Sequence, residues 1–172
     1  MVADNVAPDQ RAIDRAGVDL IVFDFDGVLT DNRVLTMDDG REGVFCSRSD
    51  GMGFDLFRRH DVPVLILSTE VNQVVTARAQ KLRAPVLQGV ADKAAALTGY
   101  CHERSIPLQR VAFIGNDVND LGVLQIVGFP MCPKDAHPAV RAVARTVVNC
   151  NGGDGVARMV AEDLLKLPWE PR

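Results

Sequence analysis

The sequence predicts one α/β domain with a doubly wound parallel sheet, helices on both faces, a small β-hairpin insert and no cap domain. Short apolar runs typical of buried strands alternate with amphipathic helical patterns, and Gly and Pro mark the boundaries between them. The predicted strands are residues 20–23, 62–67, 85–87, 111–114, 129–132 and 146–148, and the predicted helices are residues 50–60, 71–83, 92–104, 118–127, 136–144 and 155–166.

The composition is ordinary for a soluble globular protein. The 172 residues are 47% hydrophobic and 24% charged, enough for one domain with a real core. The net charge of -4 argues against a nucleic-acid surface, and no apolar run is long enough to span a membrane. Residues 1–17 are a polar leader without the apolar segment of a signal peptide, residues 18–167 form the domain, and residues 168–172 are a tail.

The four cysteines, Cys46, Cys101, Cys132 and Cys150, are widely spaced and form no metal-binding motif. A chain of this length does not need disulfides, so free thiols in a reducing cytoplasm are the expected state.

Residues 32–49 interrupt the alternation of strand and helix. An Asp-Gly pair, Asp39-Gly40, lies between two short apolar pieces, which is a hairpin signal. A hairpin here would stand over the carboxyl end of the sheet, but it is too short to form a cap domain.

The segment 24–31, Asp-Phe-Asp-Gly-Val-Leu-Thr-Asp, directly follows the first apolar strand. Asp24 and Asp26 would lie at the carboxyl end of that strand, where open α/β sheets bind ligands. Two carboxylates so close need a cation or a shared proton. Oxygen ligands of this kind suit Mg²⁺, and a carboxylate can act as a nucleophile toward phosphorus. The alternative is an acidic turn after a core strand.

Three further strand ends carry residues with related chemistry. Ser68 and Thr69 offer hydroxyls and a helix N-terminus that suit a phosphate oxygen, although they also suit a simple helix cap. Lys93 begins a predicted helix, where a lysine is most often solvated. The segment 115–120, Gly-Asn-Asp-Val-Asn-Asp, groups oxygen ligands after a buried strand, or is a capped turn.

With these four elements in order, the chain resembles the haloacid dehalogenase-like phosphohydrolases, a Rossmann-like superfamily with the motifs D-x-D-x-x-x-T, a strand-end Ser or Thr, a Lys and an acidic loop. The resemblance covers about residues 18–166. It is nearest to the capless 3-deoxy-octulosonate 8-phosphate phosphatase-like branch, similar to the phosphatases associated with acylneuraminate cytidylyltransferases. The segments that support the branch are 50–53, 88–93, 115–120 and 152–158.

The resemblance implies a Mg²⁺-dependent phosphomonoesterase. Asp24 would be the nucleophile that forms an aspartyl-phosphate, and Asp26 the general acid and base. Ser68 and Lys93 would hold phosphoryl oxygens. The metal ligands implied are Asp24, Asp26, Asn116 and Asp117, with Asp120 supporting the acidic loop.

Two positions depart from the family pattern. Asn116 stands where a metal-binding Asp is usual, so an uncharged amide would ligate the ion or Asp117 would replace it. Arg158 is followed by Met159 where the related group commonly has Glu. In that branch this tail is thought to reach an active site, often that of a neighbouring subunit in a tetramer. Arg158 is therefore either a ligand for an anionic substrate group or a solvated helix residue.

Residues after the second motif bear on the substrate. Ser68-Thr69-Glu70 stands where the octulosonate branch has Thr-Gly-Arg, so this chain looks more like relatives that act on nine-carbon sugar acids. Thr69, Glu70, Arg78 and Lys81 would then contact a sugar acid, unless they are only a charged solvent face.

The substrate implied is a small-molecule phosphate ester, an eight- or nine-carbon deoxyulosonate phosphate, and the assembly implied is a homo-oligomer, a tetramer by resemblance. Two alternatives remain open. One is a catalytically weak scaffold domain related to cytidylyltransferases. The other is a phospho-receiver domain, in which the acidic pair and the nucleophile come from different strand ends.

Overall fold

The computed structural model describes residues 17–169. The expected leader, apart from Gly17, and residues 170–172 of the expected tail lie outside the described residues. Within that range no helix is long and apolar enough to cross a membrane.

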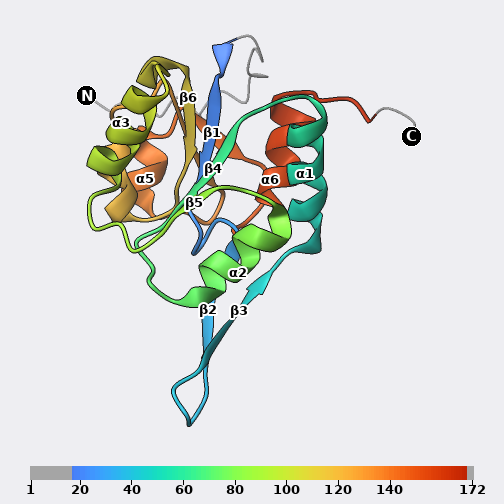
Figure 1. The fold of residues 1–172 in the computed structure, drawn as a ribbon, viewed down its shortest axis with the longest axis vertical. Helices are drawn as coiled ribbons and strands as arrows, with labels where there is room; N and C mark the ends of the chain where they lie inside the picture. The colour runs from blue at the N-terminus through green and yellow to red at the C-terminus, as the bar shows by residue number, and fades with distance from the viewer. Residues whose placement is uncertain (1–16, 170–172) are drawn as a thin grey trace, which may run out of the picture.

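A six-stranded, wholly parallel sheet forms the centre of the molecule, in the order β5-β4-β1-β6-β7-β8 (Figure 1). The chain runs outward from β1 to one edge and then crosses to the other side of β1, which makes the sheet doubly wound. The strands are β1 Leu20–Phe23, β4 Val64–Leu67, β5 Val86–Leu87, β6 Val111–Ile114, β7 Phe129–Pro133 and β8 Thr146–Val148.

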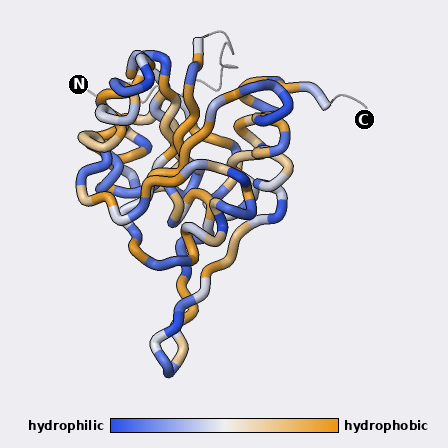
Figure 2. Tube along the Cα trace, in the orientation of Figure 1, coloured by the Kyte–Doolittle hydropathy of each residue, from blue (hydrophilic) through white to orange (hydrophobic). Residues whose placement is uncertain are grey.

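Both faces of the sheet are covered because its strands are apolar on both sides. In β1, Ile21 and Phe23 pack into one core, whereas Leu20 and Val22 pack into the other. Figure 2 shows the apolar strands in the middle and the polar segments outside. One face is covered by α1 (Arg48–Arg59), α2 (Gln73–Leu82), α6 (Val156–Met159) and a π-helical turn (Val160–Leu164), and the other by α3 (Lys93–Glu103), α4 (Leu121–Leu124) and α5 (Pro138–Val143).

The hairpin projects beyond the sheet (Figure 1). Its strands, β2 (Thr30–Thr36) and β3 (Glu42–Cys46), pair only with each other, and Gly40 turns the chain with a φ of 82°. The predicted bounds of 32–49 were too late at both ends. Thr30, the last residue of the D-x-D-x-x-x-T motif, already pairs with Cys46.

Several predicted elements differ in their extent. The predicted helix 118–127 is a 3₁₀ turn, Val118–Asp120, which Asp117 caps, followed by the short α4. The predicted helix 155–166 becomes π-helical from Val160. A further 3₁₀ turn, Leu108–Arg110, precedes β6. All four cysteines are free thiols.

Candidate active site

The carboxylate of Asp24 lies at the carboxyl end of β1, in the middle of the sheet. Its backbone N–H still donates to the carbonyl of Ile114 in β6 (2.9 Å), so the side chain emerges from the sheet in a fixed direction. Asp24 Oδ1 accepts the backbone N–H of Phe25 at 2.7 Å. The side chain is only 7% exposed.

Lys93 joins two acidic segments of the site. Its Nζ lies 2.7 Å from Asp24 Oδ1 and 2.6 Å from Asp120 Oδ1, and the Lys93 side chain is 1% exposed. Lys93 is therefore not the solvated lysine that is typical of a helix start. Asp92 caps α3 by accepting the N–H of Ala95, and this cap directs the first helical residue, Lys93, into the site.

Burial has the largest single effect on the pKa of Asp24. Burial raises the pKa of Asp24 to about 7, the negative charge of Asp120 adds to the increase, and Lys93 opposes it. Burial alone would lower the pKa of Lys93, but the charges of Asp24 and Asp120 outweigh it, so the lysine remains a firm cation. A fixed cation beside a carboxylate suits the binding of an anionic group.

Asp26 lies two residues further on, and Thr30 orients it. The Thr30 hydroxyl donates to Asp26 Oδ1 at 3.3 Å and accepts the N–H groups of Gly27 and Asn32. Burial raises the pKa of Asp26, and the nearby charge of Glu70 adds to the increase. A carboxyl group that holds its proton more tightly is suited to act as a general acid.

Gly27 is required by geometry. Its φ is 74°, and a Cβ built on it would lie 1.9 Å from Nδ2 of Asn116. The first and fourth motifs are thereby in direct contact.

The acidic loop after β6 is held by Asp120. Asp120 Oδ2 accepts the N–H groups of Asn116 (2.9 Å) and Asp117 (3.2 Å), while its other oxygen binds Lys93. Asp120 is completely buried and supports the loop from behind. Asp117 is exposed and accepts the N–H of Val118, so the capped turn expected as the alternative is present.

Ser68 is buried at the end of β4, and its Oγ accepts the N–H of Glu70 at 3.1 Å. The cap of α2 is Asn72 instead of Ser68 or Thr69, because its Oδ1 accepts the N–H of Val74. The helix-cap role that Ser68 or Thr69 could have had is therefore filled by Asn72.

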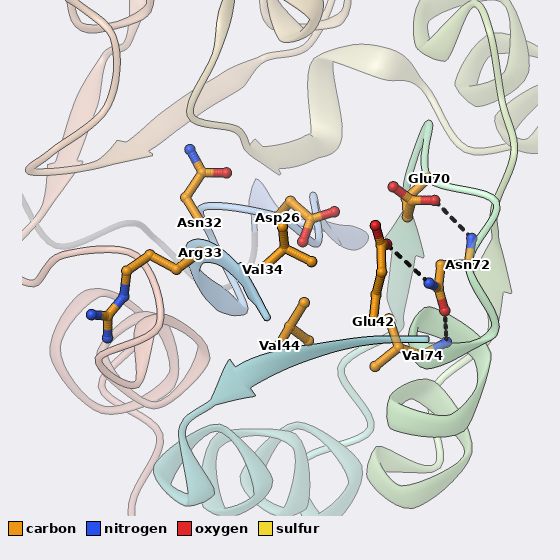
Figure 3. Close-up of a pocket in the computed structure, with 9 residues that line it drawn as sticks. All are labelled: Asp26, Asn32, Arg33, Val34, Glu42, Val44, Glu70, Asn72 and Val74. Atoms are coloured by element: carbon orange, nitrogen blue, oxygen red, sulfur yellow. Dashed lines mark hydrogen bonds between the residues drawn. The ribbon is translucent and has the colours of Figure 1, made fainter. Parts of the chain in front are cut away.

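Two adjoining cavities meet at Asp26 and Asn32. The first, of about 230 Å³, lies over Asp24, Thr69, Asn116 and Asp117. The second, of about 300 Å³, lies between the hairpin and the N-terminus of α2, with Glu42, Glu70 and Asn72 in its walls (Figure 3). A group bound over Asp24 can therefore extend past Asp26 into the second cavity.

Three predicted substrate ligands do not line either cavity. Arg78 donates to the carbonyl of Ser47 at 2.6 Å, and its Nε is buried without a partner. Lys81 is exposed near the far end of α2. Arg158 pairs with Glu162 at 2.8 Å on its own helical segment. Within one copy of the chain, the structure does not bring these residues to Asp26.

Three acidic residues that line the second cavity or hold nearby backbone were not among the predicted site residues. Glu42 is an exposed hairpin residue with no motif around it. Asp50 is fully buried and accepts the N–H of Ala157 at 2.9 Å. Asp135 accepts the N–H of Gly152 at 2.9 Å. The only available signal was the position of Asp50 and Gly152 within the segments that resemble the branch.

The oxygen donors at the first cavity suit a hard cation, which takes carboxylate, amide and carbonyl oxygens. Among the described residues no three His, Cys, Asp or Glu side chains converge as a metal-binding group. A cation here would therefore rely on amide or backbone carbonyl oxygens in addition to Asp24. Mg²⁺ is commonly held by one or two carboxylates with substrate phosphate, so the residues fit such an ion.

Comparison with known protein families agrees with the fold and the site described above. Residues 66–160, more than half of the chain, match the haloacid dehalogenase-like hydrolase family. The chain belongs to this family. It is a phosphatase, and within the family it falls in the capless branch of 3-deoxy-octulosonate 8-phosphate phosphatase-like proteins.

Individual relatives support this placement. The chain is 34% identical to the 3-deoxy-D-manno-octulosonate 8-phosphate phosphatase of Yersinia pestis over 169 residues, covering 95% of this chain and 86% of that protein. A hydrolase of the same superfamily from Streptomyces avermitilis has a TM-score of 0.85 and 46% identity, covering 88% of this chain and 87% of the other. The Moraxella catarrhalis phosphatase, solved with magnesium, phosphate and a KDO molecule, has a TM-score of 0.83 and 29% identity, covering 88% and 87%.

Proposed function

We propose that this chain hydrolyses the terminal phosphate of an eight- or nine-carbon deoxyulosonate phosphate, with Mg²⁺ as its cofactor. The observation that carries the proposal is the contact of the Lys93 ammonium with the buried Asp24 carboxylate, two residues from Asp26 at the junction of two cavities. The names of the relatives from Yersinia pestis and Moraxella catarrhalis support the choice of a sugar-acid phosphate.

The side chains have complementary roles in the proposed reaction. A carboxylate oxygen of Asp24 forms a bond to phosphorus while the ester P–O bond breaks, and Asp26 gives its proton to the departing alkoxide. Asp26, now a carboxylate, takes a proton from water, whose oxygen attacks phosphorus and releases phosphate from Asp24. Lys93 and Ser68 hold phosphoryl oxygens during both steps.

Asp24, the backbone carbonyl of Asp26, and Asn116 or Asp117 would hold the Mg²⁺ ion. Bound there, the ion would offset the repulsion between the Asp24 carboxylate and the phosphate. The ligand position at 116 carries an amide where the family usually has a carboxylate, so the site supplies one negative charge fewer. We expect weaker binding of Mg²⁺ than in relatives with Asp at that position.

We further propose that the chain acts as a homo-oligomer, a tetramer by resemblance, in the cytoplasm. The hairpin supports assembly because Val34, Leu35 and Phe45 are 55%, 54% and 63% exposed beyond the sheet. A neighbouring copy would also offer a route by which Arg158 reaches an active site. The four free thiols agree with a reducing compartment.

A substrate panel tests the proposed function. Seven- to nine-carbon ulosonate phosphates and common sugar phosphates are assayed with Mg²⁺ and with EDTA. We expect the largest kcat/KM for an eight- or nine-carbon ulosonate phosphate, loss of turnover in EDTA, and a loss of about a thousandfold or more in Asp24→Asn.

Glu103→Gln serves as the control, because this exposed carboxylate at the end of α3 lies away from the site. Absence of wild-type turnover across the panel would favour the scaffold domain. A stable phospho-aspartate in place of turnover would favour the receiver domain.

A further inference from the structure

The second cavity is where the leaving group of a bound phosphate ester must lie. Asp26, the proposed proton donor to the leaving oxygen, stands at its junction with the cavity over Asp24. The opposite wall comes from the hairpin, chiefly Asn32 and Glu42. A leaving group in this cavity would contact the hairpin, and the leaving group is the part that differs from one phosphate ester to another.

Negative charge predominates in this cavity. In Figure 3 the carboxylates of Asp26, Glu42 and Glu70 converge on the same space, whereas Arg33 points away from them. The Arg33 guanidinium is engaged by Asp31, which accepts from its Nε at 2.8 Å and from its Nη2 at 2.6 Å. No cation of the cavity wall is thus directed at the three carboxylates.

Asn72 fixes the two glutamates relative to each other. Its backbone N–H donates to Glu70 Oε1 at 2.7 Å, and its side-chain amide donates to Glu42 Oε2 at 3.2 Å. Within the described residues, Oε1 of Glu42 forms no hydrogen bond. Glu42 is therefore held in place by one oxygen while the other remains an acceptor for hydroxyl groups.

We propose that Glu42 is a specificity-determining residue: it favours a neutral, hydroxyl-bearing carbon chain next to the phosphate ester and rejects a carboxylate within two carbons of the ester carbon. A carboxylate there would face the carboxylates of Glu42 and Glu70 in a partly enclosed cavity. The inference rests on the proposed function and refines it, because a terminally phosphorylated ulosonate has hydroxyls beside the ester and its carboxylate at the other end.

Glycerol 3-phosphate and 3-phosphoglycerate test the inference, since they differ only by a hydroxymethyl group in place of a carboxylate. Their inhibition constants against p-nitrophenyl phosphate, and their dissociation constants by calorimetry, are measured on the full chain with Mg²⁺. We expect the wild type to bind glycerol 3-phosphate more tightly, and Glu42→Gln to reduce that preference about tenfold. Gln keeps the acceptor for Asn72, so the hairpin stays in place.

Glu103→Gln removes the same charge far from the cavity and should leave the preference unchanged. An unaltered preference in Glu42→Gln, or a wild type that binds both compounds equally, overturns the inference. Neither result touches the proposed function, which fails only if the wild type lacks turnover or Asp24→Asn retains it. The calorimetric constants keep the two outcomes separate, because they do not depend on turnover.

Discussion

Lys93 Nζ lies 2.7 Å from Asp24 Oδ1, so the first residue of α3 is tied to the end of β1. The same ammonium binds Asp120, and Asp120 in turn holds the loop with Asn116. One buried cation thereby fixes three of the four motifs relative to each other. Removing it would leave two buried carboxylates facing each other.

Replacement of Lys93 by Met should abolish most activity. We expect kcat/KM to fall about a hundredfold or more, because the phosphate loses a fixed cation. The pKa of Asp24 should rise further in this variant, because in the wild type the charge of Lys93 opposes the effect of burial. Steady-state kinetics check the first expectation. Activity within threefold of the wild type would contradict it, and Lys134→Met, an exposed lysine, is the control.

Binding of Mg²⁺ should strengthen as pH rises toward about 7. Burial raises the pKa of Asp24 to about 7, so below that pH a proton competes with the metal ion. We expect affinity to fall about tenfold for each pH unit below 7. Calorimetry at pH 5.5, 6.5 and 7.5 measures the slope. An affinity that does not change with pH would contradict this assignment.

Asp50→Asn should stabilise the fold at alkaline pH. Burial raises the pKa of Asp50 to about 7, from 3.8 in the unfolded chain, while the N–H of Ala157 and Arg78 oppose the increase. The folded state then binds the proton more tightly, so the carboxylate costs stability above pH 7, and this cost disappears as pH falls toward 4. The variant retains an oxygen acceptor for Ala157.

The expected gain in unfolding free energy is up to about 4 kcal/mol at pH 8, from 1.36 kcal/mol per pKa unit. Urea unfolding in EDTA at pH 8 and pH 5 measures it. The gain should shrink to less than about 2 kcal/mol at pH 5, because most of the folded protein then carries the proton on Asp50, and a variant less stable than the wild type at pH 8 would sink the prediction.

Thr30→Val should lower kcat more than it changes KM. The hydroxyl orients Asp26 and accepts the N–H groups of Gly27 and Asn32, and valine preserves only its shape. We expect kcat to fall about 10- to 100-fold, the range for impaired general acid catalysis. Thr30→Ser restores the hydroxyl and should recover most of the rate. Equal rates for the Val and Ser variants would show that the hydroxyl does not matter.

Gly27→Ala should disable the site, whereas Gly40→Ala should not. Both glycines have positive φ values, 74° and 82°, so both variants bear similar backbone strain of about 1 kcal/mol. Only at position 27 would the new Cβ overlap another residue, at 1.9 Å from Asn116 Nδ2, because nothing lies within 4 Å at position 40. Mg²⁺ affinity and kcat/KM distinguish the two variants. A loss of similar size in both would point to strain alone.

Sequence patterns predicted the sheet well because its strands are short, apolar and flanked by Gly or Pro. β1, β6 and β8 have the predicted bounds. The helices that follow acidic or glycine-rich loops were predicted less well. The close approach of Gly53 to the backbone of Ala157 depends on a contact between distant segments, which periodicity does not record. The capping box of Asp117 and Asp120 is local, and it closes a 3₁₀ turn where the pattern predicted a longer helix.

The same limit applies to the site. Motif order placed Asp24, Lys93 and Asp120 at neighbouring strand ends, but the burial of Lys93 appears only when α3 packs on the sheet. Arg78 and Lys81 share a helix in the sequence pattern. In the structure Arg78 turns toward the carbonyl of Ser47, while Lys81 lies exposed near the opposite end from Glu70. Side-chain direction requires the tertiary packing.

Thr30 belongs to two parts of the molecule at once. It orients Asp26, and it is also the first residue of β2, paired with Cys46 across the hairpin. No linker therefore separates the turn that carries Asp24 and Asp26 from the hairpin that lines the second cavity. This hairpin therefore cannot be exchanged as an independent module. Grafting a hairpin from a relative with another preference should alter the rate of phosphoryl transfer together with the choice of substrate.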